Sequence, residues 1–399
     1  MELLELLIKK FFEILDQHVK DGSKVAIAYS GGKDSTCLSL LLAEWIRERS
    51  RNDIKLLIVH SDTLSEIPEM ENWAREFIET YKSYTKKLGI EVDSVITTPK
   101  INETFYWRAI VRGYAAPTFA FRWCVYLLKR MPAREALNLV GDAKVLLGHR
   151  DDESSARVSS LTKRGAMCPL TAGRCASYYY NIEGNVVKIY PIRSWSYSDV
   201  WSYLRTWSRR INLDKLFRLY LNGAVPARYG CWHCTLVKRQ LAHYIVRDEY
   251  MYYEAARLIY KFISDIEWFR APKESGYSRL GPLTPSARAI LLRAIQLAEE
   301  LSGVRFYGLD ESRAGEYTLR SILYELPESE ADRVINEVDC SSIKKNPERY
   351  VSIGIIRNIR SHAGDLKKLI EFLHRRIETI DHDVREHMIQ MIDELPSNR

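Results

Sequence analysis

A short apolar run that leads into a glycine-containing loop and then an apolar-periodic stretch is the feature that most constrains the fold. The run covers residues 24–29, the loop reads Ser-Gly-Gly-Lys-Asp-Ser over residues 30–35, and the periodic stretch covers residues 36–45. A strand, a glycine loop and a helix form the arrangement in which backbone N–H groups and a helix N-terminus converge on phosphate oxygens. The sequence therefore predicts a phosphate-binding loop.

Each residue type of this loop suits that purpose. Glycines permit positive φ and a close approach of the backbone, a lysine supplies a point charge, and serine hydroxyls can donate to phosphate oxygens. Asp34 cannot bind phosphate directly, so we expect it to hold a Mg²⁺ that bridges the phosphates or to fix the loop. The predicted phosphate contacts come from Ser30, Gly31, Gly32, Lys33 and Ser35.

The spacing of the loop differs from the Walker pattern, because four residues do not separate its glycines from a Gly-Lys-Ser end. The loop resembles the PP-loop of the ATP pyrophosphatase superfamily, whose members cleave ATP between the α and β phosphates. A plain turn between a strand and a helix also explains two adjacent glycines. Serines on both sides and the enclosed Lys-Asp pair favour the nucleotide interpretation.

Short apolar runs alternate with helix-length segments through the first half of the chain. Such alternation predicts an α/β fold, with a doubly wound parallel sheet and ligands at the carboxyl ends of the strands. The expected strands are residues 24–29, 54–60, about 90–97, 144–149 and 187–192.

Polar residues that directly follow these strands should share one site with the loop. Asp62 and Thr63 follow the second strand, and we expect them to meet the nucleotide. Gly148 and Arg150 follow the fourth strand, where a guanidinium can clamp phosphate. Arg157 lies about two helical turns further on and is either a second phosphate ligand or a surface ion-pair residue.

Length and composition indicate a cytoplasmic protein of more than one domain. A chain of 399 residues exceeds one ordinary core, and no apolar run is long enough to span a bilayer. From about residue 235 the pattern is almost wholly helical, which predicts an all-α C-terminal region. We expect a nucleotide-binding domain with metal-binding cysteines over residues 1–235 and a helical domain over 236–399.

Two stretches could contact nucleic acid. Residues 344–376 hold nine Lys or Arg and three Asp or Glu, although a solvated helix face explains such a run as well. Residues 105–124 combine arginines with aromatic residues, which can stack a base and hold its phosphates or can form an aromatic seam between domains.

Five of the seven cysteines are candidate metal ligands. Cys37 and Cys340 are predicted to be structural or incidental. In a cytosolic chain the remaining cysteines favour metal or redox chemistry over disulfides. A four-thiolate site could consist of Cys231 and Cys234 of the C-x-x-C pair, Cys124, and either Cys168 or Cys175. Such a site would accept zinc or a four-iron four-sulfur cluster. The candidates are Cys124, Cys168, Cys175, Cys231 and Cys234.

Several ordered motifs look like the phosphoadenosine phosphosulfate reductase family. They are the loop at residues 30–35, Asp-Thr at 62–63, Phe-Arg-Trp-Cys at 121–124, Gly-x-Arg at 148–150 and Pro-Ile-x-x-Trp-Ser at 191–196. Gly-Tyr-Ala-Ala-Pro at 113–117 and Gly-Cys-Trp-x-Cys-Thr at 230–235 most resemble the DndC-like sulfurtransferases of DNA phosphorothioation.

The resemblance implies an adenine nucleotide alpha hydrolase-like fold and an ATP-dependent sulfurtransferase that uses a four-iron four-sulfur cluster. Its reaction would release AMP and pyrophosphate and activate a nucleic-acid acceptor, DNA rather than tRNA, for sulfur from a donor protein such as a cysteine desulfurase. Lys33, Asp34 and Arg150 would be the catalytic residues. Whether the chain forms a homodimer stays open.

Three alternatives remain at this point. In the first the acceptor is a tRNA base, and in the second the chain is a sulfonucleotide reductase, which the lack of a cysteine after Cys340 disfavours. The third alternative is a nucleotide-sensing subunit that binds ATP without turnover and carries a structural zinc site. The chain also lacks cysteines immediately beside its C-x-x-C, which DndC-like proteins usually have, so the fourth ligand and the acceptor stay open.

Overall fold

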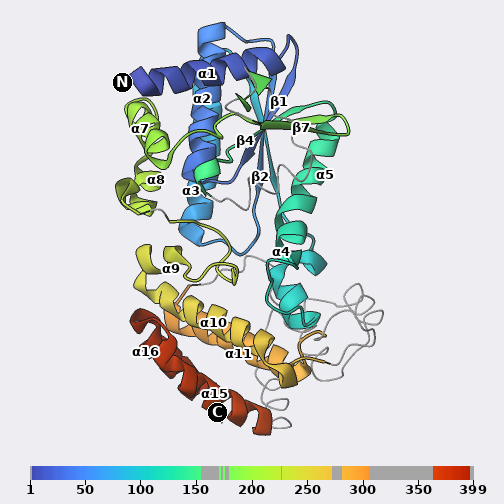
Figure 1. Cartoon of the computed structure of the whole chain (residues 1–399), viewed down its shortest axis with the longest axis vertical. Coiled ribbons are helices and arrows are strands. Elements are labelled where there is room, and N and C mark those ends of the chain that lie inside the picture. Colours follow the sequence, from blue (N-terminus) through green and yellow to red (C-terminus); the bar gives the residue numbers. More distant parts are fainter. Residues whose placement is uncertain are drawn as a thin grey trace, which may run out of the picture. The chain divides into compact units, whose positions relative to one another are not determined.

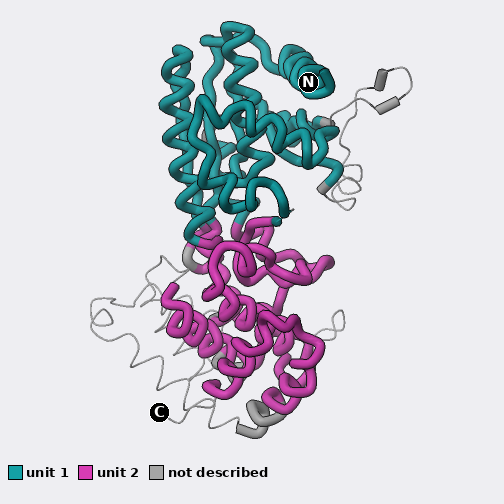
Figure 2. Tube along the Cα trace, turned by 90° about the vertical axis from the view of Figure 1, so that its left-hand side faces the viewer, with its two compact units in different colours: residues 1–62, 68–98, 129–227 teal, residues 63–67, 99–128, 228–399 magenta. Residues whose placement is uncertain are grey.

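The computed structural model describes residues 2–153, 170–171, 174–175, 179–225, 227–271, 281–304 and 363–395. The chain forms two compact units, which Figure 2 shows in different colours. Unit 1 comprises residues 1–62, 68–98 and 129–227, and unit 2 comprises residues 63–67, 99–128 and 228–399. The predicted domain division at residue 235 remains a prediction.

Unit 1 contains a six-stranded sheet in the order β3-β2-β1-β4-β8-β7. Every neighbouring pair is parallel except β7 and β8, which pair antiparallel. The predicted α/β fold with a mostly parallel sheet is therefore confirmed. The strands are β1 (Lys24–Tyr29), β2 (Lys55–Ser61), β3 (Val92–Thr97), β4 (Lys144–Leu147), β7 (Tyr179–Glu183) and β8 (Val186–Tyr190).

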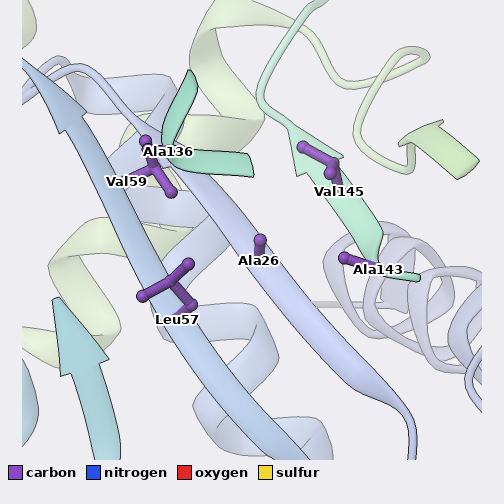
Figure 3. Close-up of a cluster of buried hydrophobic side chains, with 6 residues drawn as sticks. All are labelled: Ala26, Leu57, Val59, Ala136, Ala143 and Val145. Atoms are coloured by element: carbon purple, nitrogen blue, oxygen red, sulfur yellow. The ribbon is translucent and has the colours of Figure 1, made fainter. Parts of the chain in front are cut away.

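Helices cover both faces of this sheet, as a doubly wound fold requires (Figure 1). Alternate residues of the strands point to opposite faces, so a strand buried on both sides reads as a continuous apolar run. On one face a cluster that includes Ala26, Leu57, Val59 and Val145 packs against Ala136 of α5 (Figure 3). Unit 1 contains α1 (Glu2–His18), α2 (Lys33–Arg49), α3 (Pro68–Lys87), α5 (Met131–Val140), α7 (Tyr197–Trp207) and α8 (Asp214–Leu219).

The order of the strands determines where the functional loops lie in the sheet. The chain moves from β1 to β2 and β3 on one side, and then returns to add β4 on the other side of β1. The loops that follow β1 and β4 therefore lie at the point where the strand order reverses. In open parallel sheets this position is where ligands bind.

One strand of the sheet differs from the sequence prediction. Residues 165–186 read as irregular, but residues 179–183 form β7, which continues through a two-residue turn at Gly184 and Asn185 into β8. Gly184 has φ of +61°, which glycine adopts readily in such turns. A Gly-Asn pair between two β-prone runs is a hairpin signal that this sequence carries.

The described residues of unit 2 from 235 onward lie mainly in helices, which confirms the predicted C-terminal helical region. Helix α10 has a strongly amphipathic sequence, and its apolar face packs against α11 and α16. No helix among the described residues has the length and apolar character needed to cross a membrane. The longer helices are α10 (Met251–Asp265), α11 (Pro285–Ser302), α15 (Ala363–Arg376) and α16 (His382–Glu394), and the shorter ones include α4 (Trp123–Val125) and α9 (Leu241–Ile245).

Candidate functional site

The loop after β1 adopts the tight turn that its sequence predicts. Gly31 has φ of +74°, and a Cβ at this position would lie 2.9 Å from Cβ of Ala74. Gly32 is the N-cap of α2 and has extended backbone angles, φ −74° and ψ 162°. Of the two glycines, Gly31 uses the positive φ that glycine permits, and Gly32 places no side chain in front of the helix N-terminus.

The contrast between the two glycines predicts unequal effects of substitution on stability. Gly31→Ala should lower the free energy of unfolding by about 2 kcal/mol or more, because an αL alanine costs about 1–2 kcal/mol before the overlap with Ala74 is added. Gly32→Ala is the matched control. Its Cβ would meet only ordinary contacts at 3.5 Å, so the loss should stay below about 1 kcal/mol, typical of an alanine N-cap. Urea unfolding measures both, and equal losses would contradict the positive φ of Gly31.

Hydrogen bonds inside the loop hold its two serines. The hydroxyl of Ser35 lies 3.2 Å from that of Ser30 and donates to the carbonyl of Gly32 at 2.9 Å. The backbone N–H of Ser30 donates to Ser35 Oγ at 3.2 Å. Trp73 of α3 donates from Nε1 to the Gly31 carbonyl at 2.9 Å. The loop is thus fixed from within and from α3.

Asp34 lies between two cations. Lys33 Nζ donates to Asp34 Oδ2 at 2.8 Å, and Arg150 Nε donates to Oδ1 at 2.6 Å. Arg150 also donates through Nη1 to Asp152 Oδ2 at 3.0 Å and to the Trp195 carbonyl at 3.2 Å. Both contacts fit the second of the two roles predicted for Asp34, which is to fix the loop. Each carboxylate oxygen retains a lone pair with which it can bind Mg²⁺.

Lys33 is buried beneath two tyrosines that the sequence did not single out. Its Nζ lies 5.3 Å from the ring centre of Tyr197 and 5.5 Å from that of Tyr220, distances at which a cation is attracted to the ring face. Lys33 is 5% exposed and Asp34 is 9% exposed. A lysine and an aspartate in a loop between a strand and a helix predict exposed side chains, and this prediction is wrong for both residues.

Gly148 brings the loop after β4 against the start of α2. A Cβ on Gly148 would lie 3.1 Å from the carbonyl carbon and oxygen of Asp34 and 3.2 Å from the backbone nitrogen of Ser35. The next residue but one is Arg150, whose side chain reaches Asp34. The structure therefore brings together the residues at 30–35, 148 and 150, which the sequence predicted to share a site.

Asp62 at the end of β2 is held by a chain of polar side chains. Arg75 Nη2 donates to Asp62 Oδ2 at 2.8 Å, and its Nε lies 2.7 Å from Glu71 Oε1. His60 bridges Glu71 Oε2 and the carbonyl of Tyr29, at 3.0 Å each. Burial raises the pKa of Glu71, but the hydrogen bond with His60 and the charge of Arg75 outweigh it and leave the pKa below its usual 4.5. The carboxylate is therefore charged at neutral pH.

The C-x-x-C turn belongs to unit 2, as does Thr63. The backbone N–H of Cys234 donates to the carbonyl of Cys231 at 3.1 Å and closes the turn. The thiol of Cys231 donates to the hydroxyl of Thr63 at 3.4 Å, and Cys231 forms a β-bridge with Glu66. Thr63 thus contacts a candidate metal ligand, whereas the sequence had predicted that it meets the nucleotide.

Two buried side chains hold the carbonyls of this cysteine turn. Arg257 donates from Nη1 to the carbonyls of Cys234, at 3.1 Å, and Val237, at 3.2 Å, and from Nη2 to that of Lys238 at 3.0 Å. Gln240 donates from Nε2 to the carbonyls of Gly230 and Cys231, at 3.3 Å and 3.2 Å. No sequence motif marks either residue, because both act through distant backbone groups.

The charge of Arg257 is compensated inside the protein. Glu254 accepts from Arg257 Nε at 2.8 Å and from Arg257 Nη2, and it contacts His243 Nδ1 at 3.0 Å. Burial raises the pKa of Glu254, but its hydrogen bonds with His243 and Arg257 bring the pKa below the usual value. Burial lowers the pKa of His243 more than Glu254 raises it. A charged carboxylate–guanidinium pair therefore lies behind the cysteine turn.

An aromatic cluster joins the segment of Cys124 to the cysteine turn. The ring of Phe105 stacks on His233, between the two cysteines of the turn, with centroids 3.6 Å apart. The ring of Phe105 also lies parallel to that of Trp123, with centroids 6.5 Å apart, and edge-on to that of Tyr260, with centroids 5.5 Å apart. Burial and the charge of Cys124 raise the pKa of the Tyr260 hydroxyl. Cys124 and the C-x-x-C turn thus flank one aromatic cluster of unit 2.

The described residues contain no group of three or more His, Cys, Asp or Glu that could hold a metal. Cys231 and Cys234 supply two thiols of one tight turn, which suits half of a four-thiolate site. Cys168 and Arg157 lie outside the described residues, as does most of the basic stretch 344–376. Cys175 ends β6 (Arg174–Cys175), which pairs with β5 (Leu170–Thr171).

The family model of the phosphoadenosine phosphosulfate reductase domain matches residues 24–237, which is more than half of the chain. The chain belongs to this family. It is also 25% identical over 228 residues to the uncharacterized protein MJ0973 of Methanocaldococcus jannaschii, a match that covers 57% of this chain and 44% of that protein. The chain thus spans less than half the length of this relative.

Two solved structures are similar to parts of the chain. One is the phosphoadenylyl-sulfate reductase of Candida auris in a phosphate complex, with 17% identity and a TM-score of 0.37, covering 59% of this chain and 97% of that one. The other is the U34-tRNA thiolase NcsA of Methanococcus maripaludis with its [4Fe-4S] cluster, with 17% identity and a TM-score of 0.36, covering 66% and 79%.

Proposed function

We propose that this chain is an ATP-dependent sulfurtransferase that cleaves ATP to AMP and pyrophosphate and activates a nucleic-acid acceptor for sulfur insertion. The family and the sheet topology support a nucleotide-using enzyme of sulfur chemistry. The observation that carries the proposal is the paired loops at the point where the strand order reverses. There Lys33 and Arg150 converge on one carboxylate beside the N-terminus of α2.

This arrangement suits a polyphosphate. Two cations and a helix N-terminus stabilise negative charge, and Asp34 keeps the two cations in place until phosphate oxygens compete for them. Lys33 would then contact the β and γ phosphates as a point charge. Arg150 stays anchored by Asp152 and Trp195, so its guanidinium keeps its orientation. The buried setting strengthens each of these interactions, because water does not screen them.

The reaction would proceed in two transfers. An acceptor oxygen attacks the α phosphorus of ATP, the bond to the bridging oxygen breaks, and pyrophosphate leaves with that electron pair. The adenylated oxygen is then a good leaving group, and a sulfur nucleophile from the donor displaces it as AMP. Lys33 and Arg150 would stabilise the charge that builds up on the departing pyrophosphate, which is the largest contribution in such transfers.

The cysteines would hold an iron–sulfur cluster. We assign Cys124, Cys231 and Cys234 to it, together with Cys168 or Cys175, and zinc is the alternative metal. When bound, a cluster of this kind would supply an iron at which sulfur can be held. The backbone of the cysteine turn is already fixed by Gln240 and Arg257, so the two thiols would need little rearrangement to bind metal.

One experiment tests the proposed function. We expect the anaerobically purified protein to contain iron and acid-labile sulfide and to release AMP and pyrophosphate from ATP in equal amounts. Adding a sulfur donor with either DNA or tRNA then identifies the acceptor by mass spectrometry of its digested nucleotides, with DNA expected. A colourless protein that contains zinc and binds ATP without releasing pyrophosphate would instead be a nucleotide-sensing subunit, and the proposal would be wrong.

A further inference from the structure

Three large aromatic side chains are exposed on a short segment of unit 2. Phe119 is 71% exposed, Phe121 is 60% exposed and Tyr126 is 51% exposed. The neighbouring aromatic residues Phe105 and Trp123 are buried in the cluster beside the cysteine turn. The segment therefore separates into aromatic residues that form the core and aromatic residues that face solvent. We call residues 118–126 the aromatic turn.

The aromatic turn is held in a fixed shape. Thr118 and Phe121 exchange two backbone hydrogen bonds of 3.2 Å, and Thr118 Oγ1 accepts a further one from the N–H of Phe121 at 3.1 Å. The hydroxyl of Thr235 donates to the carbonyl of Pro117 at 3.1 Å. Thr235 directly follows Cys234, so this bond ties the base of the aromatic turn to the cysteine turn. A fixed shape lowers the entropy cost of binding a partner there.

The charge of the segment has one sign. From Thr104 to Leu128, within unit 2, the sequence has three Arg and no Asp or Glu. Arg122 is exposed, and its guanidinium carbon lies 5.1 Å from the ring centre of Phe119. An arginine over an aromatic ring, next to further exposed rings, combines a cation for phosphate with flat surfaces for bases.

We propose that the aromatic turn binds single-stranded nucleic acid, with bases stacked on Phe119, Phe121 or Tyr126 and backbone phosphate near Arg122. The proposal rests on the proposed function for its choice of a nucleic-acid acceptor. Cys124 lies within the aromatic turn in sequence, between Arg122 and Tyr126. A strand bound here would therefore be held beside a candidate metal ligand.

The charge pattern favours nucleic acid over a second copy of the chain. In a symmetric dimer the same patch meets itself, so Arg122 of one copy would approach Arg122 of the other with no acidic residue of the turn to compensate it. A polyanion meets the same surface with opposite charge. Every base has a π-face that can stack on the exposed rings, so the surface should show little sequence preference.

The test measures binding of fluorescently labelled single-stranded DNA and RNA of about 16 nucleotides, the upper site size of single-strand-binding modules, by anisotropy with the full chain. Phe119→Ala and Phe121→Ala should each weaken binding by about five- to a hundred-fold, the range seen when a stacking ring is removed. Arg122→Ala should weaken binding and flatten its dependence on salt.

Two matched controls remove the same kind of side chain elsewhere. Leu3→Ala deletes an apolar side chain that is 64% exposed, and Arg209→Ala deletes an exposed arginine of unit 1. Both should bind as the unaltered chain does. Unchanged affinity in the two phenylalanine variants, equal losses in the controls, or tighter binding of duplex than of single strands would overturn the proposal.

Further readouts separate this inference from the proposed function. Sedimentation of each variant shows whether Phe119→Ala abolishes a dimer instead of oligonucleotide binding, which would identify a second copy as the occupant and refute the proposal. Iron content and pyrophosphate release are measured on the unaltered chain. If both are absent while the phenylalanine variants still lose oligonucleotide affinity, the sulfurtransferase proposal fails and the binding surface stands.

Discussion

Lys33→Ala is expected to lower the rate of pyrophosphate release from ATP about 100-fold or more, the loss typical when a group that stabilises transition-state charge is removed. The lysine is the only loop residue of 30–35 that carries a positive charge. Its removal leaves Asp34 paired with Arg150 at 2.6 Å, so no buried charge loses its last partner. The variant should therefore fold, and the loss should be one of phosphate binding and charge stabilisation.

Lys55→Ala is the control for this experiment, because it removes an exposed lysine from the first residue of β2. Its rate should match that of the unaltered chain. The rate is followed with a coupled pyrophosphate assay at saturating ATP, and far-ultraviolet circular dichroism verifies the fold. A Lys33→Ala protein that releases pyrophosphate at nearly the normal rate would show that the loop after β1 does not bind the phosphates.

Asp34 calls for a different substitution. Asp34→Ala would leave the buried Arg150 and Lys33 without their shared carboxylate, and removing one partner of a buried ion pair commonly costs about 3–5 kcal/mol. Loss of activity in that variant would therefore reflect instability of the loop as well as chemistry. Asp34→Asn keeps the side-chain volume and one acceptor oxygen, so it separates the two effects when its unfolding and its pyrophosphate release are measured together.

The sequence predicted the sheet because its signals are local. Residues 24–29 and 144–147 are apolar runs bounded by polar turns, the pattern expected of strands covered on both faces. The capping box of Ser196 and Asp199, which begins α7, is an equally local signal. The strand β7 was missed because it is a half-exposed edge strand with a weak apolar pattern. The sequence pattern of the residues before it favoured a loop.

The parts of the site that sequence reasoning missed are those set by contacts between distant residues. Lys33 is covered by Tyr197 and Tyr220, which lie far along the chain in other elements. Arg257 holds the carbonyl of Cys234 from within α10, where its position reads as an ordinary helix residue. Residue type and spacing identify groups that carry chemistry, but burial and neighbours follow from tertiary packing, which no local pattern encodes.

Cys231→Ser and Cys234→Ser are expected to lose nearly all bound iron. The two thiols belong to one turn closed by a 3.1 Å backbone hydrogen bond, so they can bind one metal centre together. Thiolates are the ligands of iron–sulfur clusters, and serine does not replace them at comparable affinity. Metal binding also removes the proton that the Cys231 thiol donates to Thr63, so iron loading should improve as the pH rises.

Cys37→Ala supplies the control for the cysteine series. This thiol is buried in α2, where burial first and the charge of Asp34 second raise its pKa well above the usual value. It therefore stays protonated and should not bind metal. The Cys37→Ala protein should keep its full iron content, measured by inductively coupled plasma mass spectrometry and by the visible absorbance of the cluster after anaerobic reconstitution.

The same two measurements show which of the remaining cysteines bind the metal. Cys124→Ser should lose iron, because Cys124 flanks the aromatic cluster that stacks on His233 between the two cysteines of the turn. Loss of iron in only one of Cys168→Ser and Cys175→Ser identifies the fourth ligand, and we expect it in Cys175→Ser. Full iron in both would indicate three protein ligands and one iron open to sulfur. Full iron in Cys231→Ser would refute the assignment of the C-x-x-C pair to the cluster, because a thiolate ligand cannot be removed without loss of iron.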